Sequence, residues 1–145
     1  MSYIESVDIR QGTKSTSRYS NGNTLPLTQL PFGMASFVPQ TNGGNGNWFY
    51  YPEDRCLEGV RLTHQPSPWI GDYGAIVFQP QIGTPCLDAN QRWSGYRPEQ
   101  AVLRPDYLSL DFLRSRCRLE LTPTERGAAV RLTFAQEENC WLSFF

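Results

Sequence analysis

The chain has 145 residues, with 13 basic and 14 acidic side chains and one histidine, and a formal net charge of −1 at pH 7. This length suits one domain, residues 1–145, that buries roughly two-thirds of its unfolded surface and needs no metal or disulfide to hold a core. A nearly neutral chain has no field that would gather polyanions, so nucleic acid and anionic membranes are poor partners and small neutral ligands fit better. The arginines are scattered along the chain, which predicts a solvated surface position for most of them.

Turn-forming residues dominate the chain up to about residue 47, where we expect little helix. The stretch 42–47 reads Asn-Gly-Gly-Asn-Gly-Asn. It lacks the glycine and lysine spacing of a phosphate-binding loop, so it predicts a surface turn. Short apolar runs at 35–38 and 48–51 are bounded by turn residues and rich in aromatic or β-branched types. These runs predict two strands.

A loop rich in proline and glycine at 63–74 contains the only histidine, His64, together with Trp69 and Asp72. An aromatic plate flanked by hydrogen-bonding groups is what a sugar-binding surface requires, and loops commonly carry binding residues. A tight structural turn with a buried Trp69 explains the same residues. The loop is therefore the first candidate for a binding site, with both interpretations open.

Period-two patterns dominate the second half of the chain. The run 75–78 predicts a strand that is buried on both faces and closed by Pro80. Apolar residues then alternate with polar ones at 108–112, 117–121 and 130–134, which predicts an antiparallel meander with one wet face. The run 140–145 is a further apolar strand with no polar residue after it. From that uncovered strand we expect the chain to be a fragment of a longer protein.

Four cysteines lie about thirty residues apart, without a CxxC pair, and only one histidine could join them as a metal ligand. This pattern argues against a zinc site and favours free, mostly buried thiols. The N-terminus lacks a basic region followed by an apolar segment, and no apolar run reaches the length of a membrane span. We therefore expect a cytoplasmic protein that does not enter the membrane.

Four short segments carry a family resemblance. They read Gly-Asn-Thr-Leu-Pro at 22–26, Leu-Pro-Phe-Gly-Met at 30–34, Thr-His-Gln-Pro-Ser-Pro-Trp at 63–69 followed by Asp-Tyr-Gly at 72–74, and Glu-Leu-Thr-Pro-Thr-Glu-Arg at 120–126. They occur in the order seen in glycoside hydrolase family 92. The sequence therefore resembles the beginning of one of that family's exo-acting, calcium-dependent α-mannosidases.

The resemblance implies an all-β fold, an antiparallel β-sandwich of the galactose-mutarotase-like kind, here incomplete. In the family this sandwich docks on a helical (α/α)6 domain that carries the general acid, the general base and the Ca²⁺ ligands. None of those positions exists in this chain. The resemblance therefore implies a fragment that is inactive by itself, with the helical domain of the same polypeptide and α-mannoside glycans as its partners.

The same resemblance suggests which residues line the sugar pocket. Trp69 is the first choice, because an indole face covers the apolar side of a pyranose. Asp72 would accept hydrogen bonds from sugar hydroxyls, although an Asp before Tyr-Gly is also a turn former. His64 would donate to a sugar oxygen or brace Trp69, although a lone histidine is more often a partly buried structural residue.

Two further groups of residues are weaker candidates. Phe32, Gly33 and Met34 would line the pocket, with Gly33 allowing a close approach of ligand or backbone, unless they form a hydrophobic turn in the core. Trp93 and Tyr96 flank a polar dipeptide where an exposed sugar platform is conceivable but not expected.

The sequence favours one function and leaves two alternatives. The favoured one is the N-terminal, carbohydrate-binding part of an inverting exo-α-mannosidase, which supplies one wall of the mannose pocket and the interface to the catalytic domain. The alternatives are a stand-alone, non-catalytic carbohydrate-binding β-sandwich and an unstable structural remnant. The uncovered strand at 140–145 favours the fragment over a finished binding module, which would have capped that strand.

Overall fold

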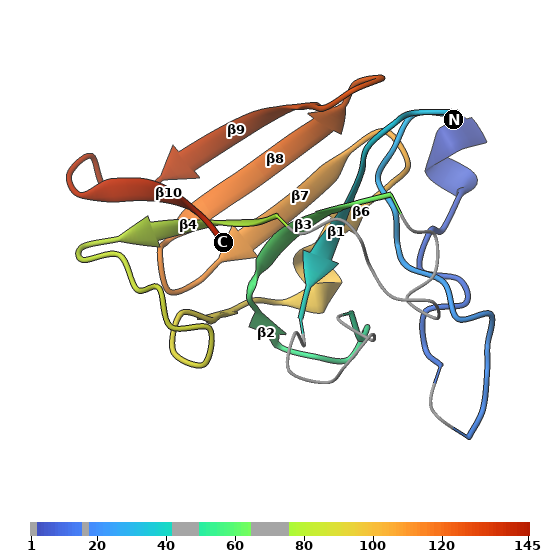
Figure 1. Cartoon of the computed structure of the whole chain (residues 1–145), viewed down its shortest axis with the longest axis horizontal. Helices are drawn as coiled ribbons and strands as arrows, with labels where there is room; N and C mark the ends of the chain where they lie inside the picture. Colours follow the sequence, from blue (N-terminus) through green and yellow to red (C-terminus); the bar gives the residue numbers. More distant parts are fainter. Residues whose placement is uncertain (1–2, 16–17, 42–49, 65–75) are drawn as a thin grey trace.

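The computed structural model describes residues 3–15, 18–41, 50–64 and 76–145, which form short antiparallel strands and no α-helix (Figure 1). Within these residues no helix is long and apolar enough to cross a membrane. The elements, in chain order, are η1 (Tyr3–Ser6), β1 (Ser36–Gln40), β2 (Cys56–Leu57), β3 (Gly59–Thr63), β4 (Val77–Ile82), β5 (Ser94–Gly95), η3 (Pro98–Gln100), β6 (Val102–Leu103), β7 (Leu108–Phe112), β8 (Cys117–Pro123), β9 (Ala128–Phe134) and β10 (Cys140–Phe144).

The strands form two four-stranded sheets and one short ribbon. The first sheet has the order β1-β3-β4-β10, and the second sheet has the order β6-β7-β8-β9. The ribbon pairs β2 with β5 and is tied to the end of β7, because the Leu113 amide donates to the Gly95 carbonyl at 3.0 Å. All of the strand pairs are antiparallel.

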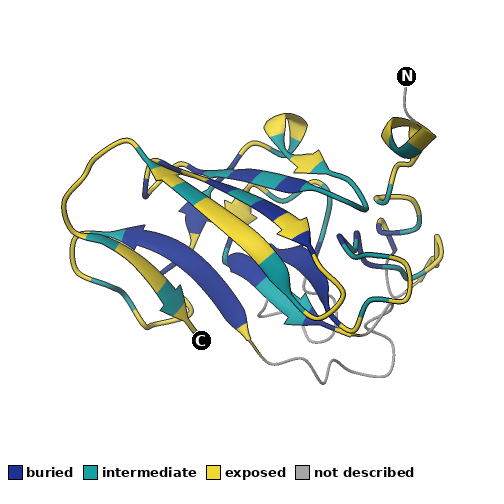
Figure 2. Cartoon of the chain, turned by 90° about the horizontal axis from the view of Figure 1, so that it is seen from above, coloured by how far each residue is buried: buried dark blue, intermediate teal, exposed yellow. Residues whose placement is uncertain are grey.

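The core lies between the two sheets. In β7 and β8 every second residue is apolar and buried, since successive side chains of a strand point to opposite faces. These side chains form one apolar cluster with residues of the first sheet. Figure 2 shows buried positions on both sheets. The buried cluster includes Phe37, Leu57, Val60, Phe78, Tyr96, Leu108, Leu110, Phe112, Leu119 and Leu121. The predicted all-β, antiparallel β-sandwich is confirmed.

Two strands of the first sheet, β1 and β4, are covered on both of their faces. All five residues of β1 and the first five residues of β4 are buried. A second apolar cluster of Leu25, Val38 and Tyr50 accounts for part of the cover on the outer face. Of the strand predicted at 75–78, Val77 and Phe78 are in β4 and buried as expected, whereas Ile76 precedes the strand and is exposed, and residue 75 lies outside the described residues.

The prediction that Pro80 closes this strand is wrong, because β4 continues to Ile82. Val77 and Phe145 exchange both backbone hydrogen bonds, at 3.1 and 2.9 Å, and Pro80 lies opposite Leu142. Hydrogen-bonded pairs alternate along an antiparallel ladder, so the nitrogen of Pro80 points away from β10. On that side β3 pairs with β4 only as far as Phe78. A proline there removes no ladder bond.

The predicted strand at 48–51 is not supported where it can be checked. Residues 48 and 49, like the predicted turn at 42–47, lie outside the described residues. Tyr50 and Tyr51 belong to no strand, and the Tyr51 amide donates to the Thr41 hydroxyl at 2.8 Å. A side chain thus satisfies this backbone donor in place of a neighbouring strand, while Tyr50 is buried as a core residue.

Two expectations about side-chain exposure need correction. All four cysteines are free, as predicted, but only Cys117 is buried, and Cys56 is exposed. Cys56 precedes the buried Leu57 in β2, so strand alternation turns its thiol outward. Arg92 departs from the surface pattern of the arginines, with only 6% of its area exposed.

One edge of the sandwich leaves its inner face uncovered. Along β9 and β10 the residues that pair with core positions of β8 and β4 point inward between the sheets. Several of them are nevertheless exposed, with 41% for Val130, 37% for Leu142 and 64% for Phe144. We call this set the open edge: Val130, Leu132, Phe134, Leu142 and Phe144.

Candidate functional site

A hollow of about 510 Å³ lies where three segments of the chain meet. The segments are the residues just before β1, the end of β3, and the turn between β8 and β9. The hollow is lined by Met34, Ala35, Leu62, Thr63, His64 and Arg126. We call it the His64 hollow.

Strand pairing and two turns bring these residues together. Ser36 of β1 lies opposite Thr63 of β3, so the residues next to this pair, including His64, meet at one end of the first sheet. The Met34 amide donates to the Glu125 carbonyl at 2.7 Å, which joins the turn before β1 to the β8–β9 turn. The second turn is closed by a hydrogen bond from the Thr124 amide to the Gly127 carbonyl at 2.8 Å, with Arg126 near its tip.

The turn at 31–34 presents apolar side chains to solvent. The Gly33 amide donates to the Leu30 carbonyl at 2.9 Å, and a Cβ added at Gly33 would lie 3.1 Å from that oxygen. Glycine therefore permits a close backbone approach here. Phe32 is fully exposed and Met34 is 72% exposed, so neither side chain belongs to the core.

The lining of the His64 hollow combines an apolar surface with nitrogen groups that can form hydrogen bonds. Met34, Ala35 and Leu62 supply an apolar surface, while the imidazole of His64 and the guanidinium of Arg126 supply nitrogen groups for hydrogen bonds. Among the residues that line it there is no carboxylate. The hollow can therefore position a ligand, but its own residues provide no carboxyl acid and base pair for hydrolysis.

The structure joins only some of the predicted site residues. His64 and Met34 border the same hollow, and Phe32 and Gly33 lie in the adjoining turn without lining it. Trp69 and Asp72 follow His64 by a few residues in the sequence and lie outside the described residues.

Arg126 is a lining residue to which the sequence assigns no role. It is the last residue of the segment 120–126. The only sequence feature that could have pointed to it is its position in the turn between two strands with alternating apolar residues. Which turn reaches His64 depends on the packing of the two sheets, which the alternation alone does not specify.

The other aromatic candidates divide clearly. Tyr96 is 4% exposed and packs in the core, and burial raises the pKa of its phenol, so it offers no platform to solvent. Trp93 is 47% exposed, next to the buried Arg92 and Ser94. No group of three or more His, Cys, Asp or Glu side chains that could hold a metal ion occurs in the described ranges.

Two antiparallel sheets with a shared core and a hollow at one end define a β-sandwich domain. Residues 6–144 match the model of the glycosyl hydrolase family 92 N-terminal domain. The chain belongs to glycosyl hydrolase family 92, within its N-terminal domain. No curated protein matches the sequence.

Solved structures of family 92 enzymes share this fold. An inverting mannosidase from Bacteroides thetaiotaomicron is 33% identical, with a TM-score of 0.86 over 97% of this chain and 19% of that chain. An alpha-mannosidase from the same bacterium, also solved with mannoimidazole, is 24% identical, with a TM-score of 0.83 over 96% and 19%. Another glycosyl hydrolase of the family is 18% identical, with a TM-score of 0.74 over 92% and 19%. The chain thus spans about a fifth of the length of these enzymes.

Proposed function

We propose that this chain is the N-terminal part of an inverting exo-α-mannosidase. In this proposal the His64 hollow forms one wall of the mannose pocket, and the open edge receives a further part of the same polypeptide. The observation that carries the proposal is the hollow itself, which combines apolar and nitrogen-bearing side chains at the end of a family 92 sandwich.

The chemistry of the hollow supports a positioning role. Apolar side chains such as Met34 and Leu62 would contact the C–H face of a pyranose, and Arg126 and His64 would address its hydroxyls. We further propose that Trp69 covers the sugar ring and that Asp72 accepts hydrogen bonds from it. A carboxylate acceptor gives a stronger hydrogen bond than a neutral one.

The reaction would depend on groups that another domain supplies. Inverting hydrolysis needs two carboxyl groups roughly 6.5 to 9.5 Å apart, one as general acid and one as general base for water. We propose that both belong to the helical catalytic domain, together with the Ca²⁺ ligands. Calcium takes six to eight oxygen ligands, and no cluster of acidic residues in the described part of this chain fits that need.

Binding by the chain alone can be measured by tryptophan fluorescence during a titration with mannose. We expect a response in the parent chain that is lost in Trp69→Ala and retained in Trp93→Ala. A response that survives Trp69→Ala and disappears in Trp93→Ala would contradict the assignment of Trp69.

The wall can be tested in the longer enzyme with an aryl α-mannoside and added calcium. Loss of one sugar hydrogen bond costs about 0.5–1.5 kcal/mol, so His64→Ala and Arg126→Ala should each lower kcat/KM roughly 2- to 12-fold. Ala129→Ser, on the outer face of β9, serves as the control. Unchanged kcat/KM in both hollow variants would refute the wall, and no release of mannose by the longer enzyme would refute the activity.

A further inference from the structure

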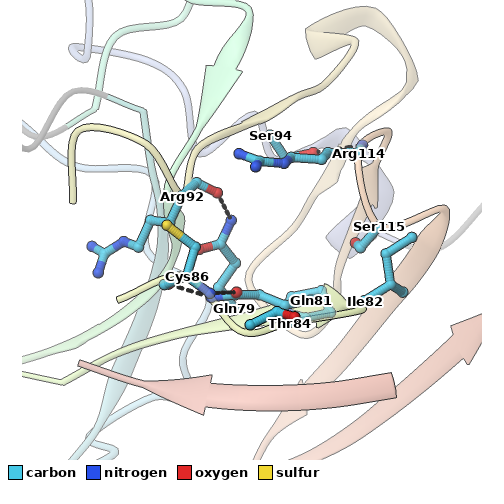
Figure 3. Close-up of a pocket in the computed structure, with 10 residues that line it drawn as sticks. Gln79, Gln81, Ile82, Thr84, Cys86, Arg92, Ser94, Arg114 and Ser115 are labelled. Atoms are coloured by element: carbon cyan, nitrogen blue, oxygen red, sulfur yellow. Dashed lines mark hydrogen bonds between the residues drawn. The ribbon is translucent and has the colours of Figure 1, made fainter. Parts of the chain in front are cut away.

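A second, smaller cavity of about 50 Å³ lies beside the outer face of β4, away from the His64 hollow. It is bounded by β4, by the segment between β4 and β5, and by the turn between β7 and β8 (Figure 3). Gln79 comes from β4, Arg92 from the segment just before β5, and Ser115 from the β7–β8 turn. The cavity therefore lies at the junction of the two sheets and the ribbon.

Three side chains of this lining carry a buried polar atom without a partner. These atoms are Oε1 of Gln79, Nε of Arg92 and Oγ of Ser115. Their residues are 1%, 6% and 3% exposed. A buried polar group left unpaired destabilises a fold, so three of them around one cavity require an explanation.

The neighbouring polar groups are already paired within the protein. The side-chain amide of Gln81 is paired twice with the backbone of Cys86. Its Nε2 donates to the Cys86 carbonyl at 3.0 Å, and its Oε1 accepts from the Cys86 backbone N–H at 2.6 Å. The Ser94 hydroxyl donates to the Gly95 carbonyl and accepts from the Arg114 amide, both at 3.0 Å. Among the buried side-chain atoms of this lining, those without a partner are the three named above.

The donor or acceptor character of the three unpaired atoms indicates which kind of molecule could occupy the cavity. Gln79 Oε1 only accepts, the N–H at Arg92 Nε only donates, and the Ser115 hydroxyl does both. A halide or carboxylate would satisfy the donors and repel the Gln79 oxygen. A metal cation would be disfavoured by the positive charges of Arg92 and Arg114, with no carboxylate in the lining to offset them. Water can donate to Gln79 and accept from Arg92.

The size of the cavity fits the same occupant. One water needs roughly 10–15 Å³ of such space, so a cavity of about 50 Å³ has room for more than one. We propose that this cavity is an internal hydration site, in which ordered water molecules bridge Gln79, Arg92 and Ser115. These waters would connect the first sheet to the ribbon and to the β7–β8 turn.

The site also lies next to the end of the first sheet. The Gln79 amide donates to the Arg92 carbonyl at 2.7 Å, which fixes the backbone of Arg92. The guanidinium of Arg92 stacks on the Phe145 ring, 3.8 Å from its centroid. Burial disfavours a charged guanidinium unless its N–H groups are paired. A water molecule at Arg92 Nε would supply the hydrogen bond that this atom lacks, in addition to the contact with the Phe145 ring.

The sign of a stability change separates a hydrated cavity from a dry one. In a dry cavity Ser115→Ala removes an unpaired buried hydroxyl and should raise Tm. In a hydrated cavity it removes a partner of the bound water, and we expect Tm to fall by roughly 2–4 °C. Ser94→Ala, which removes a hydroxyl paired within the protein, should lower Tm in either case and serves as the matched control. A rise in Tm for Ser115→Ala would overturn the proposal.

Crystals of the chain grown with bromide give a second readout that does not depend on variants. Water density within hydrogen-bond distance of Gln79 Oε1 and Ser115 Oγ, without an anomalous signal, is the expected result. An anomalous bromide peak would overturn hydration in favour of an anion site. An empty cavity in well-ordered density would overturn it in favour of a dry one.

Discussion

Phe32 lies in the left-handed region of backbone space, with φ at 59°, and its ring is fully exposed. A bulky residue in this region is uncommon and stores strain of the order of 1–3 kcal/mol. The ring does not pack against the described part of the chain, so no burial of its surface offsets this strain. Because the ring lies exposed in the turn beside the His64 hollow, it is accessible to a group outside the sandwich.

Replacing Phe32 should separate stability from binding. Asparagine tolerates the left-handed region, so Phe32→Asn should raise the free energy of unfolding by about 1 kcal/mol, as measured by urea denaturation. Asn23 already occupies this region with φ at 53°, and Asn23→Ala should change stability in the opposite direction. A loss of stability in Phe32→Asn would show that the ring packs where we find it exposed.

The thiols should differ sharply in reactivity. Burial raises the pKa of Cys117 to about 12, whereas Cys56 is exposed. Because the thiolate is the reactive form, a disulfide reagent at pH 8 should modify Cys56 quickly and Cys117 only after unfolding. Peptide mapping can follow the modification of each thiol separately. Equal modification rates for Cys56 and Cys117 in the folded chain would contradict the burial of Cys117.

The same shift has a consequence for stability. The folded chain holds the Cys117 proton more tightly than the unfolded chain, whose thiol has a pKa near its ordinary value of 9.0. The stability contributed by the buried thiol is therefore fully present below about pH 9, and it is lost progressively as the pH rises from there to about 12. Cys117→Ala should flatten this alkaline loss in a series of urea titrations.

At the scale of elements, the approach of β3 to β4 depends on Gly59. Its φ is 144°, and an added Cβ would lie 2.7 Å from the Phe78 carbonyl oxygen and 2.7 Å from a methyl group of Val77. Gly59→Ala should therefore lower the free energy of unfolding by roughly 3 kcal/mol, through both strain and overlap.

Gly83 provides a matched comparison for Gly59. It also has a positive φ, at 73°, but an added Cβ would meet nothing within 4 Å. Gly83→Ala should therefore cost only the backbone strain of roughly 1–2 kcal/mol. Equal losses in the two variants, measured by thermal unfolding, would show that close packing does not distinguish the two positions.

The elements that the sequence predicts well are those whose pattern is local. In the second sheet the alternation of Leu119 and Leu121 with polar residues matches their burial, because one face meets the core and the other meets solvent. Pro80 misleads, because its effect depends on which neighbouring strand lies on its nitrogen side. Tyr50 misleads because it is buried without belonging to a strand.

The candidate site is predictable to a similar extent. His64 and Met34 could be proposed from their segments, and the structure places both at one hollow. Arg126 joins them only through the packing of the β8–β9 turn against the turn before β1, which is a long-range contact. The burial of Arg92 likewise depends on the closure of the ribbon over the first sheet. No local pattern in the sequence specifies either contact.

At the scale of the whole molecule, the proposal that a further part of the same polypeptide covers the open edge can be tested on that edge. In the 145-residue chain Val130 and Leu142 are exposed apolar side chains beside unpaired strand edges, which favours self-association. Val130→Lys combined with Leu142→Lys should therefore reduce the sedimentation-average mass of the isolated chain. In the proposed longer enzyme the same pair should lower Tm, because it would place charges in the interface that covers the open edge.

Ala129→Lys supplies the control for this pair, since Ala129 lies on the outer face of β9 opposite Thr122. It should leave both the mass and Tm nearly unchanged. If the double lysine variant of the longer enzyme keeps the parent Tm, the open edge is not covered there, and a finished binding module becomes the better description.

The first sheet also constrains the order in which the chain can fold. The strands of the second sheet follow one another along the chain, so each can pair as soon as its neighbour is made. In the first sheet β4 pairs with β10, which follows it only after the whole second sheet, and the long stretch of chain between the two strands must close before their pairing contributes stability. Nascent chains stalled before residue 140 should therefore be cut by protease within β4, and chains in which β10 has fully emerged should resist. Between the completion of β9 at residue 134 and the pairing of β10, the edge of β4 that faces β10 would be exposed, and chaperones would meet the chain in this half-closed form.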